Sequence, residues 1–135
     1  MSTATVKYQG QLRTLATHTK SGETFITDAP TDNKGKGQAF SPTDTVATSL
    51  ATCMITVMGI ASNTHDINMD GTWADVTKVM AENPRRISEV HIDMHIKDNG
   101  LDAHQKILLE RAAITCPVAQ SLNKDIKQVI NFNYF

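Results

Sequence analysis

The chain has 135 residues, of which 40% are hydrophobic and 20% are charged, as is typical of a soluble globular protein. This length fits one domain, so we expect residues 1–135 to form a single unit. The 13 basic and 14 acidic residues give a formal net charge of -1, which creates no field that would attract a polyanion. The composition therefore argues against nucleic acid as a partner.

The N-terminus, Met1 to Val6, lacks the basic start and apolar core of a secretory signal. The longest apolar run, Cys53 to Ala61, is shorter than the roughly 20 residues that a membrane-spanning helix needs. Two cysteines are too few for a secreted disulfide scaffold, and a reducing compartment disfavours a permanent bond between them. We therefore expect a cytoplasmic protein without a membrane partner, whose cysteines form only a transient disulfide.

Turn signals divide the first third of the chain. Apolar and polar residues mix between Thr3 and Asp28, with turns at Gly10 and Gly22, which predicts three short antiparallel strands. The segment 30–37 is rich in Asp, Asn, Lys and Gly and predicts an exposed, mobile loop.

A helix is predicted to begin at Ser41 and Pro42. Serine suits the N-cap, proline suits the first turn, and Asp44 completes a capping box. The apolar residues that follow recur every three or four positions, and this spacing predicts one buried helix face with Cys53 inside it. The members of that face are Val46, Leu50, Cys53, Met54, Val57 and Ala61.

The second half alternates between strand and helix patterns. Segment 69–80 predicts a strand, Asn83-Pro84 a turn, and the strict alternation from Val90 to Ile96 a half-buried strand. A helix over 101–115, a short helix through Leu122 and a strand over 126–134 complete the chain. The order of three strands, helix, two strands, two helices and strand predicts an α+β fold.

The two cysteines are the candidate chemical groups. Cys116 precedes Pro117, and as the N-cap of a helix it would face free N–H groups that favour a thiolate and lower the thiol pKa. Cys53 lies within an apolar helix stripe, where the simpler interpretation is a core-filling cysteine.

Two segments carry a resemblance to a known family. Ser41-Pro42-Thr43-Asp44 followed by Cys53-Met54, and Cys116-Pro117-Val118-Ala119-Gln120-Ser121-Leu122, resemble the two signature cysteine segments of the OsmC/Ohr proteins. The element order agrees as well, so the resemblance covers nearly the whole chain.

The resemblance implies an intertwined homodimer with a buried cysteine helix and an active site at the subunit interface. It also implies a peroxidase without a cofactor, in which the Cys53 thiolate attacks an organic hydroperoxide and the resulting sulfenic acid condenses with Cys116. A dithiol reductant, typically a lipoylated protein in the family, then resets the pair.

The chain departs from this pattern at the groups that support the thiolate. The family's peroxidases use a glutamate in the first signature and an arginine upstream, whereas Thr43 occupies the glutamate position here. Asp44 is one residue later and better explained as the capping acid. For the arginine, Arg13, Arg85 or Arg86 would have to reach the site, although the last two fit a solvated strand entrance.

Three functions therefore remain open. The first is a two-cysteine peroxidase, the second a non-catalytic relative that binds a small hydrophobic ligand or senses oxidants, and the third a dimer with a reversible disulfide. A metal site at His91, Asp93 and His95 is disfavoured, because His91 and His95 would lie about 13 Å apart along a strand.

Overall fold

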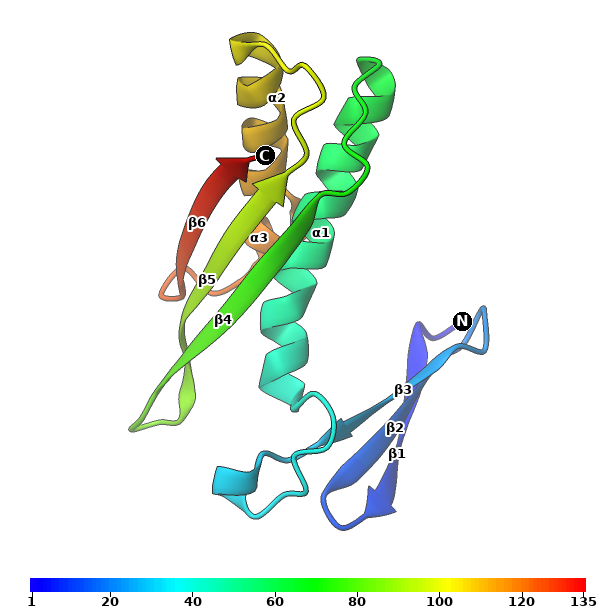
Figure 1. The fold of residues 1–135 in the computed structure, drawn as a ribbon. Helices are drawn as coiled ribbons and strands as arrows, with labels where there is room; N and C mark the ends of the chain where they lie inside the picture. Colours follow the sequence, from blue (N-terminus) through cyan, green and yellow to red (C-terminus); the bar gives the residue numbers. More distant parts are fainter. The chain divides into compact units, whose positions relative to one another are not determined.

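The computed structural model describes all residues 1–135, and its order of elements confirms the predicted α+β fold (Figure 1). The predicted sequence of three strands, helix, two strands, two helices and strand is found, with one added 3-10 turn, η1 (Thr31–Asn33). The contacts of the chain group it into two compact units, Met1–Val46 and Ala47–Phe135.

The first unit is built on a three-stranded antiparallel sheet in the order β1-β2-β3. Its strands are β1 (Ala4–Gly10), β2 (Arg13–His18) and β3 (Thr24–Asp28). The segment after β3, predicted as a mobile loop, contains η1 and is tied back to the sheet, since Asp28 N–H donates to the Phe40 carbonyl at 3.0 Å.

Helix α1 (Pro42–Thr64) begins where the sequence predicts. Ser41 Oγ accepts from the Asp44 N–H at 3.1 Å, and Asp44 Oδ2 accepts from the Ser41 N–H at 2.9 Å, which makes a capping box. By length and composition alone α1 is apolar enough to cross a bilayer, a test that core helices of soluble proteins also pass. The apolar run from Cys53 to Ala61, which Thr56 and Gly59 interrupt, covers only part of this helix.

The second unit contains a sheet in the order β4-β5-β6. Strands β4 (Trp73–Ala81) and β5 (Arg86–Ile96) form an antiparallel hairpin whose turn contains the cis peptide Asn83-Pro84. Strand β6 (Lys127–Tyr134) pairs with β5 in parallel. The first of these strands begins later than predicted, because Thr72 N–H donates to the Met69 carbonyl at 3.0 Å in a turn.

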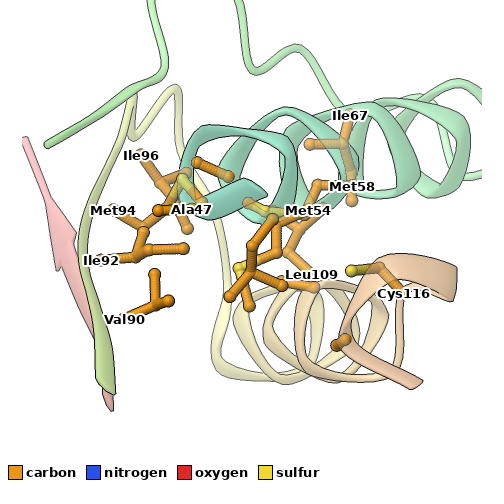
Figure 2. Packing of buried hydrophobic residues seen from close by; sticks show 14 residues of the cluster. Ala47, Met54, Met58, Ile67, Val90, Ile92, Met94, Ile96, Leu109 and Cys116 are labelled. Atoms are coloured by element: carbon orange, nitrogen blue, oxygen red, sulfur yellow. The ribbon is translucent and has the colours of Figure 1, made fainter. Parts of the chain in front are cut away.

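The core of the second unit lies between one face of this sheet and the helices α1, α2 (Ala103–Ile114) and α3 (Pro117–Ser121) (Figure 2). The alternate residues of β5 point at the helices and are fully buried: Val90, Ile92, Met94 and Ile96. From α1, Leu50, Met54 and Met58 meet them, each with no exposed surface. This packing fixes which face of α1 turns inward, and with it the direction of the cysteine side chain on the same helix.

Candidate functional site

Cys53 lies near the middle of α1, next to the fully buried Met54. It is partly exposed and packs against the edge of the buried cluster. The regular spacing of apolar residues along α1 brings Cys53 to the side of the helix that borders the core. Cys53 therefore borders the apolar cluster and is itself only partly buried.

Cys116 lies where α2 gives way to α3. Pro117 cannot continue the preceding helix but suits the first position of the next one, so Cys116 becomes the N-cap residue, with extended φ -64° and ψ 155°. Its backbone remains anchored, since its N–H donates to the Ala113 carbonyl at 3.3 Å and its carbonyl accepts from Gln120 N–H at 3.1 Å. The side chain is 0% exposed and turns into the cluster (Figure 2).

The two thiols meet, although α1 carries one and the α2–α3 junction the other. The side chains of Cys53 and Cys116 lie next to each other, close enough for Cys53 to raise the pKa of the Cys116 thiol, and both cysteines are free thiols. Neighbouring thiols can join as a disulfide when their geometry allows it. The arrangement thus provides a pair of thiols that can be oxidised to a disulfide.

The prediction that the N-cap lowers the pKa of Cys116 is wrong. Burial raises the pKa of the Cys116 thiol, and this effect outweighs the Ala119 and Val118 N–H groups, which act in the opposite direction. The hydrogen bond and negative charge of Cys53 raise the pKa of Cys116 further. Neither N–H group makes a capping hydrogen bond to the sulfur. The Cys116 thiol therefore keeps its proton at neutral pH.

Thr43 and Asp44 occupy the first turn of α1. Asp44 is the acid of the capping box, as predicted from the sequence. Thr43 Oγ1 lies 3.3 Å from Ser41 Oγ. These contacts lie at the start of the helix.

Arg13 forms an ion pair with Asp28 that the sequence alone does not predict. Its Nε donates to Asp28 Oδ1 at 2.7 Å and its Nη2 to Oδ2 at 2.8 Å, while Nη2 also donates to Gln38 Oε1 at 3.1 Å. The Asp28 side chain is fully buried, and the hydrogen bond from Arg13 lowers its pKa. Register explains the pairing, because Arg13 and Asp28 lie opposite each other on β2 and β3.

Arg85 and Arg86 lie at the turn between β4 and β5. Arg86 Nη1 donates to the carbonyls of Glu82 and Pro84, both at 2.9 Å, and Arg85 lies 3.8 Å from a Glu82 carboxylate oxygen. Neither arginine is among the groups that act on the Cys116 thiol.

The two histidines of β5, which are candidate metal ligands by sequence, contact neighbouring side chains instead. His91 Nε2 lies 3.3 Å from Glu89, and His95 stacks on Trp73 with ring centroids 4.2 Å apart. No group of three or more His, Cys, Asp or Glu side chains is arranged to hold a metal ion.

The structure is that of an α+β protein in which two cysteines, one from α1 and one from the α2–α3 junction, lie side by side. Comparison with known proteins gives its family. The family model for OsmC-like proteins matches residues 35–131, so the chain belongs to the OsmC-like family of stress-response proteins. No curated protein sequence matches the chain at a significant level.

Solved structures agree with this assignment. A Psychrobacter arcticus protein, described as belonging to the osmotic-stress-induced and detoxification response, is 51% identical over 98% of this chain and 96% of its own, with a TM-score of 0.94.

Two more distant structures share the fold. An organic hydroperoxide resistance protein OsmC of Legionella pneumophila has a TM-score of 0.75 at 17% identity, covering 98% of each chain. A Vibrio cholerae protein described as an organic hydroperoxide resistance protein, with captopril bound in one of its active sites, has a TM-score of 0.74 at 14% identity, covering 98% of this chain and 92% of that one.

Proposed function

We propose that this chain reduces organic hydroperoxides with the Cys53–Cys116 pair. The observation that carries the proposal is the contact between the two thiols, one partly exposed and one fully buried. The hydroperoxide resistance described for the Legionella and Vibrio proteins of the same fold supports the choice of substrate class.

The asymmetry of the pair supports Cys53 as the nucleophile. A hydroperoxide has access to the partly exposed residue Cys53, whereas Cys116 is enclosed and its raised pKa keeps it protonated. In the first step the Cys53 thiolate attacks the outer peroxide oxygen, the O–O bond breaks, and the alkoxide leaves and takes up a proton. Cys53 becomes a sulfenic acid and the substrate becomes an alcohol.

The second step forms the disulfide. The Cys116 thiol gives up its proton, its sulfur attacks the Cys53 sulfenic sulfur, and hydroxide leaves as water. A cytoplasmic dithiol, such as a lipoyl group on a protein partner, then takes up the oxidising equivalents and restores two thiols. The protein itself needs no cofactor in this cycle.

A homodimer is part of the proposal. Large apolar side chains of the first unit are exposed, with Val6 66%, Tyr8 68% and Phe25 56% accessible, and on α1 Ile60 is 61% accessible. Exposed apolar surface of this kind marks association sites, and a second copy of the chain would cover it. Sedimentation equilibrium at micromolar concentration should give twice the chain mass, and a monomer would contradict this part of the proposal.

The test of the proposed activity uses single cysteine variants. With cumene hydroperoxide as substrate and dihydrolipoamide as reductant, the wild-type protein should turn over, whereas Cys53→Ser should not. Thr56→Ser, one turn further along α1, is the matched control and should keep the wild-type rate. Turnover by Cys53→Ser at the wild-type rate would refute the role of Cys53.

A second candidate is a non-catalytic dimer that binds a small hydrophobic ligand or senses oxidants. It is favoured by Thr43 at the glutamate position and by Arg13, whose guanidinium is held by Asp28 and Gln38. Peroxide consumption no faster than that of free cysteine, together with an acyl compound that co-purifies with the protein, would select this function. A third outcome is a dimer with a reversible disulfide. It would form the Cys53–Cys116 disulfide but would show neither peroxide turnover nor a co-purified acyl compound.

A further inference from the structure

The two sulfurs of the pair differ in what can approach them. Cys116 is fully buried among the core residues, and Cys53 borders the core with part of its surface open. Figure 2 shows the Cys116 side chain pointing toward the cluster that also contains Met58 and Leu109. Cys116 stays buried and Cys53 stays partly exposed when the two sulfurs form a disulfide, because neighbouring side chains need to move only a little to form the bond.

Reduction of a disulfide requires a defined direction of approach. The incoming thiolate attacks one sulfur from the side opposite to the S–S bond, and the other sulfur leaves as a thiolate. An attack on Cys116 would have to come from the side away from Cys53, which for a fully buried residue lies within packed protein. An attack on Cys53 would come from its partly open side.

We infer that an external dithiol attacks the Cys53 sulfur of the disulfide and that Cys116 is always the leaving group. This inference rests on the proposed disulfide cycle. The first thiolate of the dithiol bonds to Cys53 Sγ, the Cys53–Cys116 bond breaks, and its electron pair goes to Cys116 Sγ, which takes up a proton. The second thiol of the dithiol then attacks its own bonded sulfur, closes a cyclic disulfide and releases Cys53.

The raised pKa of Cys116 makes it a slow leaving group, since a thiol of lower pKa leaves faster. Its departing charge falls near the N–H groups of Val118 and Ala119, which favour a negative sulfur, while burial disfavours that charge. These effects set how fast Cys116 leaves. Access decides whether the dithiol bonds to Cys53 or to Cys116, since a thiolate cannot attack a sulfur that it cannot reach.

The same cysteine therefore serves both half-reactions. Cys53 meets the hydroperoxide and then the reductant, and Cys116 meets only Cys53. A reductant therefore needs to present its thiol only to the partly exposed side of Cys53.

The attacked sulfur can be located directly. Full-length protein is oxidised with one equivalent of cumene hydroperoxide, and intact mass confirms the disulfide before any thiol is added. It then meets a brief pulse of the monothiol N-acetylcysteine, which cannot close a ring. Acid quench, N-ethylmaleimide and trypsin follow. Cleavage separates Cys53, on the peptide of residues 37–78, from Cys116, on that of residues 112–124.

The expected result is N-acetylcysteine on Cys53 and N-ethylmaleimide on Cys116. The reverse pattern, or equal labelling of both peptides at the earliest time, would overturn the inference while leaving the disulfide cycle intact. If the oxidised protein contains no disulfide before the thiol is added, the proposed function itself fails and the inference fails with it.

Single-cysteine variants give a second measurement that does not depend on the wild-type disulfide. Cys116→Ala and Cys53→Ala are each converted, after brief unfolding and refolding, to the mixed disulfide with 5-thio-2-nitrobenzoate. Dithiothreitol should release the dye from Cys53 about tenfold faster or more than from Cys116, because the rate of exchange depends on access to the attacked sulfur. Equal release rates from two variants that retain the native circular dichroism spectrum would contradict the inference.

Discussion

The thiol of Cys116 lies next to the thiol of Cys53, which raises its pKa, and only Cys116 is completely withdrawn from solvent. The contact joins the middle of α1 to the N-cap of α3, two positions far apart in the chain. It makes a disulfide accessible in one step and gives its two members unequal roles.

The raised pKa of Cys116 predicts that sulfenic acid accumulates on Cys53 at neutral pH. Resolution needs the Cys116 thiolate, which burial disfavours. Stopped-flow mixing with hydroperoxide should therefore show disulfide formation that accelerates as pH rises above 7, with dimedone trapping the sulfenic acid most efficiently at the low end. A resolution rate independent of pH between 6 and 9 would contradict this assignment.

The same pKa predicts the pH dependence of stability. Because the folded Cys116 pKa is raised above its unfolded value of about 8.5, its contribution is complete below that pH and declines as pH rises through the folded pKa. The free energy of unfolding of the reduced protein should fall over the alkaline range above about pH 8.5. Urea denaturation of Cys116→Ala should show a smaller fall across that window, with Cys53→Ala as the comparison.

Asp28→Asn should destabilise the first unit. The substitution removes the carboxylate that accepts two hydrogen bonds from Arg13 and one from the Gln38 N–H. The lowered pKa of Asp28 contributes stability above its unfolded pKa of about 3.9, and this is lost as pH falls through the folded pKa. Thermal unfolding should show a lower Tm at pH 7 and a weaker acid dependence, whereas Glu23→Gln should change neither.

Met54→Ala should cost about 2–5 kcal/mol, because a fully buried side chain leaves a cavity between α1 and the sheet. Chemical denaturation of the reduced protein measures the change. Thr56→Ser, on an exposed side of the same helix, is expected to stay within about 0.5 kcal/mol of wild type. A loss below about 1 kcal/mol for Met54→Ala would contradict the packing described.

Asp102→Ala should cost about 1 kcal/mol. Asp102 is the N-cap of α2, and its carboxylate accepts from the Gln105 N–H at 2.8 Å while the Gln105 side chain accepts from the Asp102 N–H at 3.0 Å. Asp102→Asn is the matched control, since asparagine caps nearly as well. Equal losses in the two variants would indicate that the cap contributes little.

The element order could be predicted because each element has a local signal. Ser41 and Asp44 mark the start of α1, and the alternation from Val90 to Ile96 marks β5. The division of the strands into two sheets and the parallel pairing of β5 with β6 could not be predicted, since neither depends on neighbouring residues.

At the candidate site, too, the local sequence predicts some features and the packing of the chain determines the others. The two cysteines were found from their sequence context, but their contact is a property of packing. The N-cap position of Cys116 was predicted correctly, while its pKa was predicted in the wrong direction, because the completeness of its burial cannot be inferred from the sequence. Asp28 was missed for a similar reason: an acid at a strand end gives no sign that an arginine lies opposite it.

The intact mass of the reduced protein after one equivalent of cumene hydroperoxide tests the central claim most directly. A Cys53–Cys116 disulfide predicts the loss of two hydrogen atoms in the wild type and a retained oxygen in Cys116→Ala. An unchanged mass, or a retained oxygen in the wild type at completion, would contradict a redox pair formed by these two residues.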